Sequence, residues 1–254
     1  MASKAFEFAL SNGAISLGLE LEPEQLARLL AFARLLAKWN RVYNLTAIRE
    51  GDVVVTHHLL DCLAIIAPLQ RELRHLRELS WSPPLPGEPD SGGIRSEATR
   101  LLDVGSGGGL PGAVIAIACP EIRVTCVDAV GKKTAFVRQV AAEIALTNLH
   151  ATHRRVEDVH GTFDVVVSRA FATLEEFFAA SLHVLAPSGI WLAMKARMTQ
   201  GELAGAASVA SVFHVEQLTV PGVGAERCAV WAKRKTRTEA TLKTESASRR
   251  LRKP

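Results

Sequence analysis

The chain has 254 residues, of which 48% are hydrophobic, and a formal net charge of +4. This length allows one large α/β domain with an extension, or two small domains. The chain has no run of about eighteen or more apolar residues, which argues against a membrane span. Residues 1–11 lack the long apolar segment of a signal peptide. We therefore expect a cytoplasmic protein with no membrane partner.

The positive charge is concentrated at the C-terminal end. Residues 233–254 contain nine Lys or Arg and two Glu, so this segment carries +7 and the rest of the chain carries −3. Such a segment is typical of an arm that contacts nucleic-acid phosphates. It is equally typical of a solvated end without a specific role, and both interpretations stay open.

The four cysteines predict neither a disulfide framework nor a metal site. Cys62, Cys119, Cys126 and Cys228 form no C-x-x-C pair, and no histidine cluster accompanies them. His57 and His58 are adjacent, and on a helix they would point about 100° apart, which suits joint binding of one ion poorly. We expect buried, reduced thiols and no metal.

The N-terminal part, residues 1–70, reads as a helical extension. Pro23 suits the first turn of a helix, and apolar residues recur at helical spacing over residues 22–39. A second helix is predicted over residues 54–67, with a turn or loop at 40–49. Prolines and glycines crowd the next segment, 71–99, which predicts an inserted linker and a long loop.

Beyond the insert, strands alternate with helices, and we assign residues 100–234 to one domain and 235–254 to a basic tail. Repeated β-α-β alternation predicts a mostly parallel sheet with helices on both faces. The predicted strands cover residues 101–105, 123–128, 151–156, 163–168, 189–195, 213–219 and 227–233, and the predicted helices 111–119, 132–145 and 173–185.

The strongest chemical signal is a glycine-rich segment, residues 103–112, between a predicted strand and a predicted helix. Glycines let a ligand approach the backbone closely. The G-x-G-x-x-G pattern fits at Gly107, Gly109 and Gly112, so dinucleotide binding stays open. Pro111 opposes it, because proline removes a backbone donor where a helix would bind pyrophosphate. Asp103 favours a cationic cofactor over a diphosphate. No G-K-[ST] follows, which excludes a P-loop.

Other polar residues stand at the predicted strand ends, where ligands bind in open α/β sheets. Asp128 can accept hydrogen bonds from the ribose hydroxyls of a nucleoside. The remaining candidates for pocket and substrate residues, each of which is also compatible with an ordinary loop charge, are Glu157, Asp158, Ser168, Arg169, Lys195 and Arg197.

Several separate motifs, in order along the chain, resemble the RsmG family, also called GidB or glucose-inhibited division protein B. Members of this family are bacterial methyltransferases that act on N7 of a guanine in small-subunit (16S) ribosomal RNA. The resemblance covers about residues 15–233 apart from the insert. The motifs are Trp39–Thr46, His58–Asp61, Asp103–Gly112, Gly131–Lys133, Arg138–Val140 and Ser168–Phe171.

The resemblance implies a class I (Rossmann-like) methyltransferase fold, in which the last strand of a seven-stranded sheet is antiparallel and a helical extension precedes the sheet. It implies S-adenosylmethionine as cofactor, with Asp128 near the ribose and Asp103 and Gly107 in the glycine-rich loop. The matching positions for further cofactor contacts are Gly105, Leu110, Val156, Glu157 and Arg169.

For the substrate, the resemblance implies that Arg138 and Lys195 position the RNA, with Lys132, Lys133 and Arg197 on its backbone. The partner is then small-subunit RNA, or the assembling or assembled subunit, and we expect a monomer. His57 and Ala196 depart from the family pattern, so a phosphate grip at residue 57 and the turn after residue 195 do not transfer. The insert and the tail are longer than usual in the family.

Guanine N7 carries a lone pair and needs no proton removed, so we expect direct in-line methyl transfer with positioning and electrostatics, and no general base. The chain has Ser168-Arg-Ala-Phe where amino methyltransferases of bases have Asn-Pro-Pro-Tyr, and no Pro-Cys pair. The alternatives are a methyltransferase for a small molecule or protein, and a non-catalytic RNA-binding assembly factor. A dinucleotide oxidoreductase is the weakest alternative.

Overall fold

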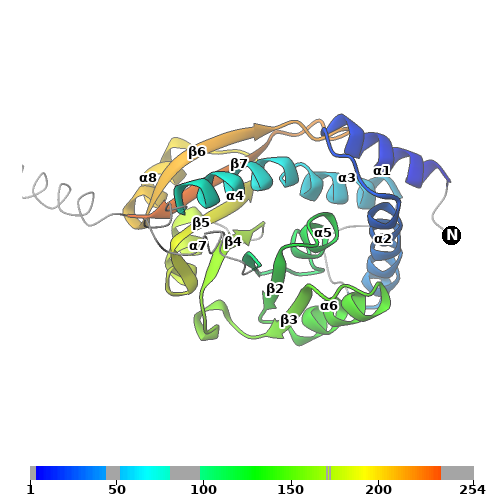
Figure 1. Cartoon of the computed structure of the whole chain (residues 1–254), viewed down its shortest axis with the longest axis horizontal. Helices are drawn as coiled ribbons and strands as arrows, with labels where there is room; N and C mark the ends of the chain where they lie inside the picture. Colours follow the sequence, from blue (N-terminus) through cyan, green and yellow to red (C-terminus); the bar gives the residue numbers. More distant parts are fainter. Residues whose placement is uncertain (1–3, 44–51, 81–97, 170, 172, 236–254) are drawn as a thin grey trace, which may run out of the picture.

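A seven-stranded sheet forms the centre of the molecule, in a computed structural model that describes residues 4–43, 52–80, 98–169, 171 and 173–235 (Figure 1). The strand order is β3-β2-β1-β4-β5-β7-β6. Strands β1 to β5 are parallel, and β7 runs antiparallel to both β5 and β6. The strands are β1 (Arg100–Val104), β2 (Arg123–Asp128), β3 (Leu149–His153), β4 (Phe163–Ser168), β5 (Leu185–Lys195), β6 (Ala210–Leu218) and β7 (Arg227–Arg234). The predicted seven-stranded class I fold is confirmed.

Two apolar layers cover the two faces of the sheet, because successive side chains of a strand point to opposite faces. In β4, Val165 and Val167 join one layer and Val166 joins the other. Within the described residues, the first layer contains six helices and the second contains two helices and two short 3-10 turns. The first-layer helices are α1 (Lys4–Ser16), α2 (Pro23–Tyr43), α3 (Asp52–Leu63), α4 (Ile66–Ser80), α5 (Gly112–Ala118) and α6 (Gly131–Glu143). The second layer has η1 (Val156–Asp158), α7 (Leu174–Ser181), η2 (Leu182–Val184) and α8 (Gln200–Val209).

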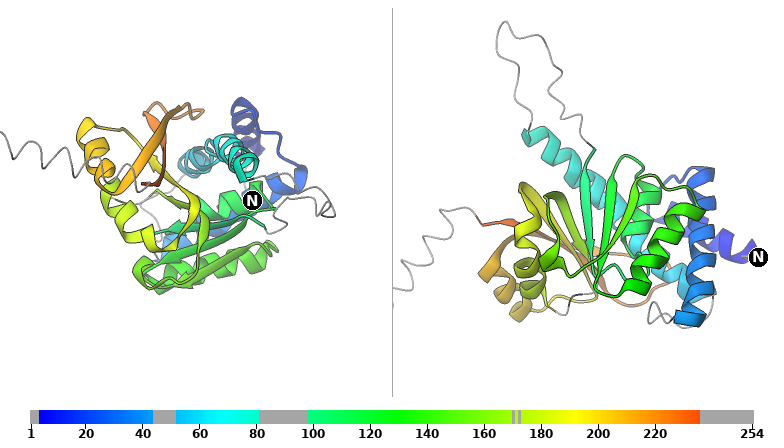
Figure 2. Two further views of the ribbon diagram at one scale, coloured as in Figure 1. Left: turned by 60° about the vertical axis from the view of Figure 1, so that its left-hand side comes forward. Right: turned by 90° about the horizontal axis from the view of Figure 1, so that it is seen from below.

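The N-terminal helices share their core with the sheet, and two views of the ribbon show them laid along one side of it (Figure 2). Phe32 and Trp39 of α2 contact the ring of Phe136 on α6, with centroids 6.3 and 5.5 Å apart. Arg71 of α4 pairs with Glu216 of β6 at 2.6 Å. The extension therefore reaches from α6, which packs against β2 and β3, to β6 at the other edge of the sheet.

Some predicted boundaries are wrong. Helix α4 continues to Ser80, so residues 71–80 of the predicted insert are helical. Leu69 and Leu73 are buried at helical spacing, and the charged residues between and after them hide the pattern. Strand β3 ends at His153 instead of reaching residue 156, and α8 was not predicted. The rest of the predicted insert, most of the predicted loop at 40–49, and the basic tail from residue 236 lie outside the described residues.

The connections of this sheet define one place for ligands. The chain leaves β1 toward β2 on one side, whereas β4 lies on the other side of β1. In open α/β sheets, ligands bind outside the carboxyl ends of strands at such a reversal.

A helix with the length and apolar character needed to span a membrane is absent from the described residues.

Candidate active site

The loop that follows β1 turns sharply on its glycines. Gly105, Gly107 and Gly109 have φ of 68°, 56° and 79°, which a residue with a side chain adopts only at a cost. A Cβ on Gly109 would come within 3.2 Å of the Ala113 Cβ and 3.3 Å of the Val137 Cγ2. Leu110, within the loop, is buried. The loop therefore packs closely against α5 and α6. Its backbone, without side chains at the glycines, faces the carboxyl ends of the strands where a ligand would bind.

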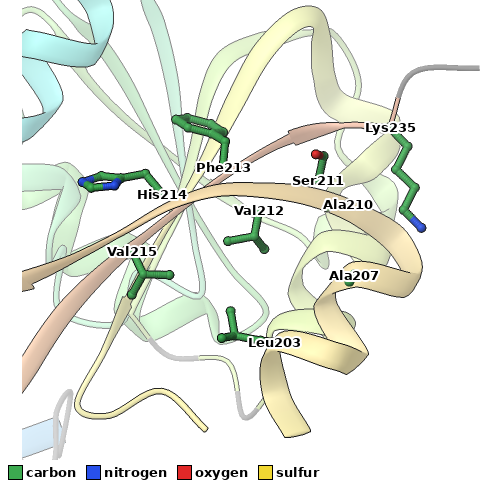
Figure 3. A pocket seen from close by; sticks show the side chains of 9 residues that line it. All are labelled: Leu203, Ala207, Ala210, Ser211, Val212, Phe213, His214, Val215 and Lys235. Atoms are coloured by element: carbon green, nitrogen blue, oxygen red, sulfur yellow. The ribbon is translucent and has the colours of Figure 1, made fainter. Parts of the chain in front are cut away.

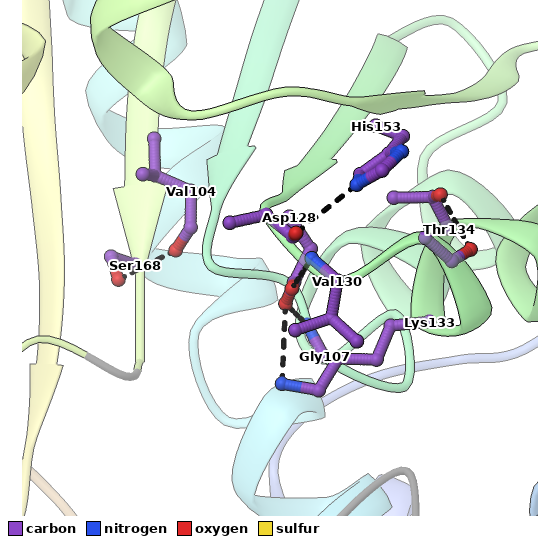
Figure 4. Close-up of polar contacts among 10 residues, drawn as sticks. Val104, Gly107, Asp128, Val130, Lys133, Thr134, His153 and Ser168 are labelled. Carbon is purple, nitrogen blue, oxygen red and sulfur yellow. Dashed lines mark hydrogen bonds and ion pairs between the residues drawn. The ribbon is translucent and has the colours of Figure 1, made fainter. Parts of the chain in front are cut away.

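Asp128 ends β2 beside this loop and orients it (Figure 4). Its Oδ2 accepts a hydrogen bond from the Gly107 N–H at 3.0 Å, and its Oδ1 accepts one from the Val130 N–H at 2.9 Å. Lys133 lies 3.5 Å from Oδ2, so the lysine predicted to contact RNA is an ion-pair partner of this carboxylate. An ionised carboxylate has about four acceptor sites, so Asp128 retains capacity for a ligand hydroxyl.

Asp103, one residue before the end of β1, is fully buried. Its Oδ2 accepts a hydrogen bond from the Gly112 N–H at 2.8 Å, and its Oδ1 has no hydrogen-bond partner among the described residues. Burial raises the pKa of this carboxyl to about 7, while the bond from Gly112 and the charge of Arg169 act in the opposite direction. A cation placed near Oδ1 would favour its ionised form.

The end of β4 connects the glycine loop to helix α3. The Ser168 hydroxyl donates a hydrogen bond to the Val104 carbonyl oxygen at 2.8 Å, which ties β4 to the end of β1. Arg169 then points to α3, where its Nη1 lies 3.3 Å from Asp61 Oδ2 and 3.5 Å from His58 Nδ1. This arginine was predicted as a cofactor contact, and in the structure it is also an ion-pair partner of the helical extension.

Asp61 holds a second arginine that the sequence analysis did not single out. Arg227, the first residue of β7, donates from Nε to Asp61 Oδ1 at 3.0 Å. The Asp61 side chain is 10% exposed, and it joins α3, β4 and β7 at one point. In the sequence, Asp61 is recognisable only as one acidic residue among the leucines of α3. That pattern does not identify the arginines that pair with it.

These residues line a cavity of about 260 Å³, which we call the target cavity. Lys195, at the end of β5, borders it, but its Nζ pairs with Glu202 at 2.9 Å and donates to the Phe171 carbonyl oxygen at 3.5 Å. Ala196 also lines it. Among the described residues, the lining consists of His58, Asp61, Arg169, Met194, Lys195, Ala196, Leu218, Arg227 and Cys228.

His58 is neutral in this cavity. Burial, followed by the charge of Arg169, lowers its pKa to about 4. A guanidinium can only donate, so the Nδ1 that faces Arg169 is the acceptor and the ring proton is on Nε2. The neighbouring His57 lies instead against the turn between β6 and β7, where a Cβ on Gly222 would come within 3.0 Å of its Nε2.

Several predicted site residues lie outside the target cavity. Arg138 is exposed on α6 and donates from Nε to the Ala151 carbonyl oxygen at 3.1 Å. Arg197 pairs with Glu226 at 2.8 Å and is largely exposed, and Lys132 is exposed in the first turn of α6. Val156 is buried and Glu157 is exposed on η1. Most of the RNA candidates thus lie on outer surfaces, whereas the cofactor candidates that form or border the loop are Asp103, Gly105, Gly107, Leu110 and Asp128.

A larger, open pocket of about 510 Å³ lies at the β6 edge of the sheet, between α8 and β6 (Figure 3). Leu203, Val212 and Val215 line it, and it contains none of the predicted site residues. Within the described part of the chain, no group of three His, Cys, Asp or Glu residues could hold a metal ion. All four cysteines are buried and free.

Comparison with known proteins gives consistent matches. The GidB family model, described as rRNA small subunit methyltransferase G, matches residues 25–76 and 93–231. A protein named ribosomal RNA small subunit methyltransferase G from Acidovorax sp. (strain JS42) is 51% identical over 231 residues, which cover 91% of this chain and 96% of the relative. Its namesake from Albidiferax ferrireducens is 52% identical over 228 residues, 90% and 97% of the two chains. A solved TehB-like SAM-dependent methyltransferase from Corynebacterium glutamicum aligns with a TM-score of 0.44 and 15% identity, over 68% of this chain and 99% of that chain.

Proposed function

Because the chain belongs to the GidB family of rRNA small subunit methyltransferases G, we propose that it transfers a methyl group from S-adenosylmethionine to N7 of a guanine in 16S ribosomal RNA. One observation carries the proposal. A glycine loop with two buried carboxylates, Asp103 and Asp128, adjoins the target cavity at the ends of β1 and β4. Ser168 and Arg169 join the two regions, so a cofactor on the loop would face a base in the cavity.

The residues around the loop fit this cofactor. When bound, S-adenosylmethionine supplies a methyl group on a positively charged sulfur. Asp103 has a buried carboxylate oxygen without a partner among the described residues, which suits the cationic amino-acid end of the cofactor. Asp128 would accept the ribose hydroxyls, and Gly105 and Gly107 would allow close approach of the backbone. Further contacts are proposed from Leu110, Val156, Glu157 and Arg169.

The target cavity suits a substrate that needs orientation and no base. Guanine N7 has a free lone pair, so no proton has to leave before it attacks. His58 is a poor base, since its pKa is about 4 and its Nδ1 accepts from Arg169. The residues of this chain would therefore bind and orient the guanine and exclude water. Lys195 and Arg138 are proposed to position the RNA, with Lys132, Lys133 and Arg197 near its phosphates.

The test is methyl transfer from labelled S-adenosylmethionine to naked small-subunit RNA and to assembled subunits, with the modified nucleoside identified by mass spectrometry. We expect 7-methylguanosine at one site. The variant D128A should lose cofactor binding and label together. Label on a protein or a small molecule would favour a different substrate class. Cofactor binding without any transfer would favour a non-catalytic assembly factor, and binding of NAD in its place would favour an oxidoreductase.

A further inference from the structure

We propose that Arg227 selects guanine in the target cavity by donating a hydrogen bond to O6 of the base, and that Asp61 holds Arg227 in position for this contact. The inference rests on the proposed function, because it names the group that recognises the base at the same site.

Among the described side chains that line the target cavity, hydrogen-bond donors outnumber acceptors. Both oxygens of Asp61 accept from arginines, at 3.0 and 3.3 Å. Nε of Arg227 bonds to Asp61 and Nη1 bonds to the Glu226 carbonyl oxygen at 2.9 Å, whereas Nη2 has no partner within the described residues. His58 adds an Nε2–H donor.

This set of groups matches one purine. On its major-groove edge, guanine presents two acceptors, N7 and O6, whereas adenine presents the N7 acceptor and the N6 amino donor. An arginine often bonds to both guanine acceptors, but here N7 has to remain free to attack the methyl group. A single bond from one guanidinium nitrogen to O6 satisfies both conditions, and an amino group in that position would face another donor.

Arg227 fits this role better than Arg169. Arg169 lies toward the glycine loop, since its charge acts on buried Asp103 and its Nη1 contacts Asp61, His58 and the Cys62 sulfur at 3.7 Å. Arg227 approaches Asp61 from β7, on the other oxygen. Asp61 therefore lies between two guanidinium groups. That of Arg169 is on the side of the glycine loop, and that of Arg227 is on the side of β7.

The charge of Asp61 also matters for the product. Methylation at N7 leaves a positive charge on the base, which an uncompensated guanidinium would oppose. Asp61 offsets part of the charge of both arginines at 10% side-chain exposure, where screening by water is weak. Asp61 is thus a positioning residue that also reduces the repulsion between the Arg227 guanidinium and the positively charged methylated base.

The test is a cycle of one protein change and one RNA change, measured after the target guanine has been mapped. The protein change is R227M, which keeps the length of the side chain and removes its donors. The RNA change replaces the target guanine by 2-aminopurine, which keeps N7 and lacks O6. Single-turnover methyl transfer with full-length protein in excess is measured for all four combinations.

We expect each single change to lower the rate roughly 10- to 100-fold, and the double change to cost little more than either alone, within about threefold. R227K should recover part of the rate on guanine and none on 2-aminopurine. Matched control R71M removes an arginine that pairs with Glu216 outside the cavity and should stay within about twofold of the unchanged protein. R227M should remain folded at the assay temperature in thermal unfolding, and its S-adenosylmethionine affinity should match that of R71M.

Two results would overturn the inference while leaving the proposed function intact. One is a normal rate of R227M on guanine RNA, and the other is a double change whose loss equals the product of the two single losses. If the unchanged protein forms no 7-methylguanosine on unmodified RNA, the proposed function fails, and the inference fails with it.

Discussion

The glycine loop and the target cavity lie side by side but are built in opposite ways. The loop is one continuous segment whose shape depends on backbone angles and on hydrogen bonds from its own N–H groups to Asp128 and Asp103. The cavity is assembled from side chains of α3, β4, β5, β6 and β7 around the charge of Asp61. The loop should therefore be sensitive to added atoms, and the cavity to changes in charge.

The largest expected effect comes from D61N, which leaves two guanidiniums without their carboxylate. We expect methyl transfer to fall more than about 100-fold and the free energy of unfolding to fall by about 2–3 kcal/mol, because both arginines retain some contact with water. Denaturant unfolding and single-turnover rates measure the two effects. D61E should recover much of both losses, and equal stability of D61N and the unchanged protein would contradict the role of Asp61.

The second effect tests the loop by adding one carbon atom. In G109A an alanine would have to adopt a positive φ, and its methyl group would lie 3.2 and 3.3 Å from neighbouring side-chain atoms. We therefore expect the free energy of unfolding to fall by about 1–3 kcal/mol and the cofactor affinity to fall clearly. Gly18 has φ of 70° and open space around its Cβ position, so G18A isolates the cost of the backbone angle. Similar losses of stability and of affinity in the two variants would show that crowding at the loop is unimportant.

A smaller effect is expected at Lys195, at the border between the two regions. K195A removes the cation that pairs with Glu202, and we expect methyl transfer to RNA to fall about tenfold. Cofactor affinity should change less than about twofold, because the glycine loop is untouched. Rates and binding titrations on one preparation give the comparison, and equal losses in both would reassign Lys195 to the cofactor.

The smallest effect is on pH dependence and concerns Asp103. Its pKa of about 7 in the folded protein lies above the ordinary value of 3.8, so the folded state holds an extra proton between these values. The contribution of Asp103 to stability therefore falls as pH rises from about 4 to 7. Because a cationic cofactor prefers the ionised carboxyl, its affinity should rise severalfold from pH 6 to 8. Calorimetric titration tests this, with D103N expected to show no such rise.

The parts predicted from sequence were those encoded by neighbouring residues. Strands β2 and β4 were predicted at their observed bounds because each is a short apolar run between polar residues. Helix α8 was missed because its Gly201 and Gly205 weaken any helical pattern. The glycine loop was recognised because its glycines, which allow the positive φ angles of the turn, are close together in the sequence.

The pairing at the centre of the target cavity could not be predicted in this way. Asp61 and Arg227 are 166 positions apart, and neither carries a local pattern that names the other. Arg138, which was predicted to position the substrate, is exposed on α6 and donates a hydrogen bond to the backbone of β3. Its role in binding RNA stays a prediction.

The position of β7 between β5 and β6 has a consequence during synthesis of the chain. A ribosome releases the glycine loop, Asp128 and Arg169 well before Arg227, which opens the seventh strand. A nascent chain thus has every residue of the cofactor loop while Asp61 still lacks its second arginine, and the cavity for the base can be completed only after residue 227 has emerged.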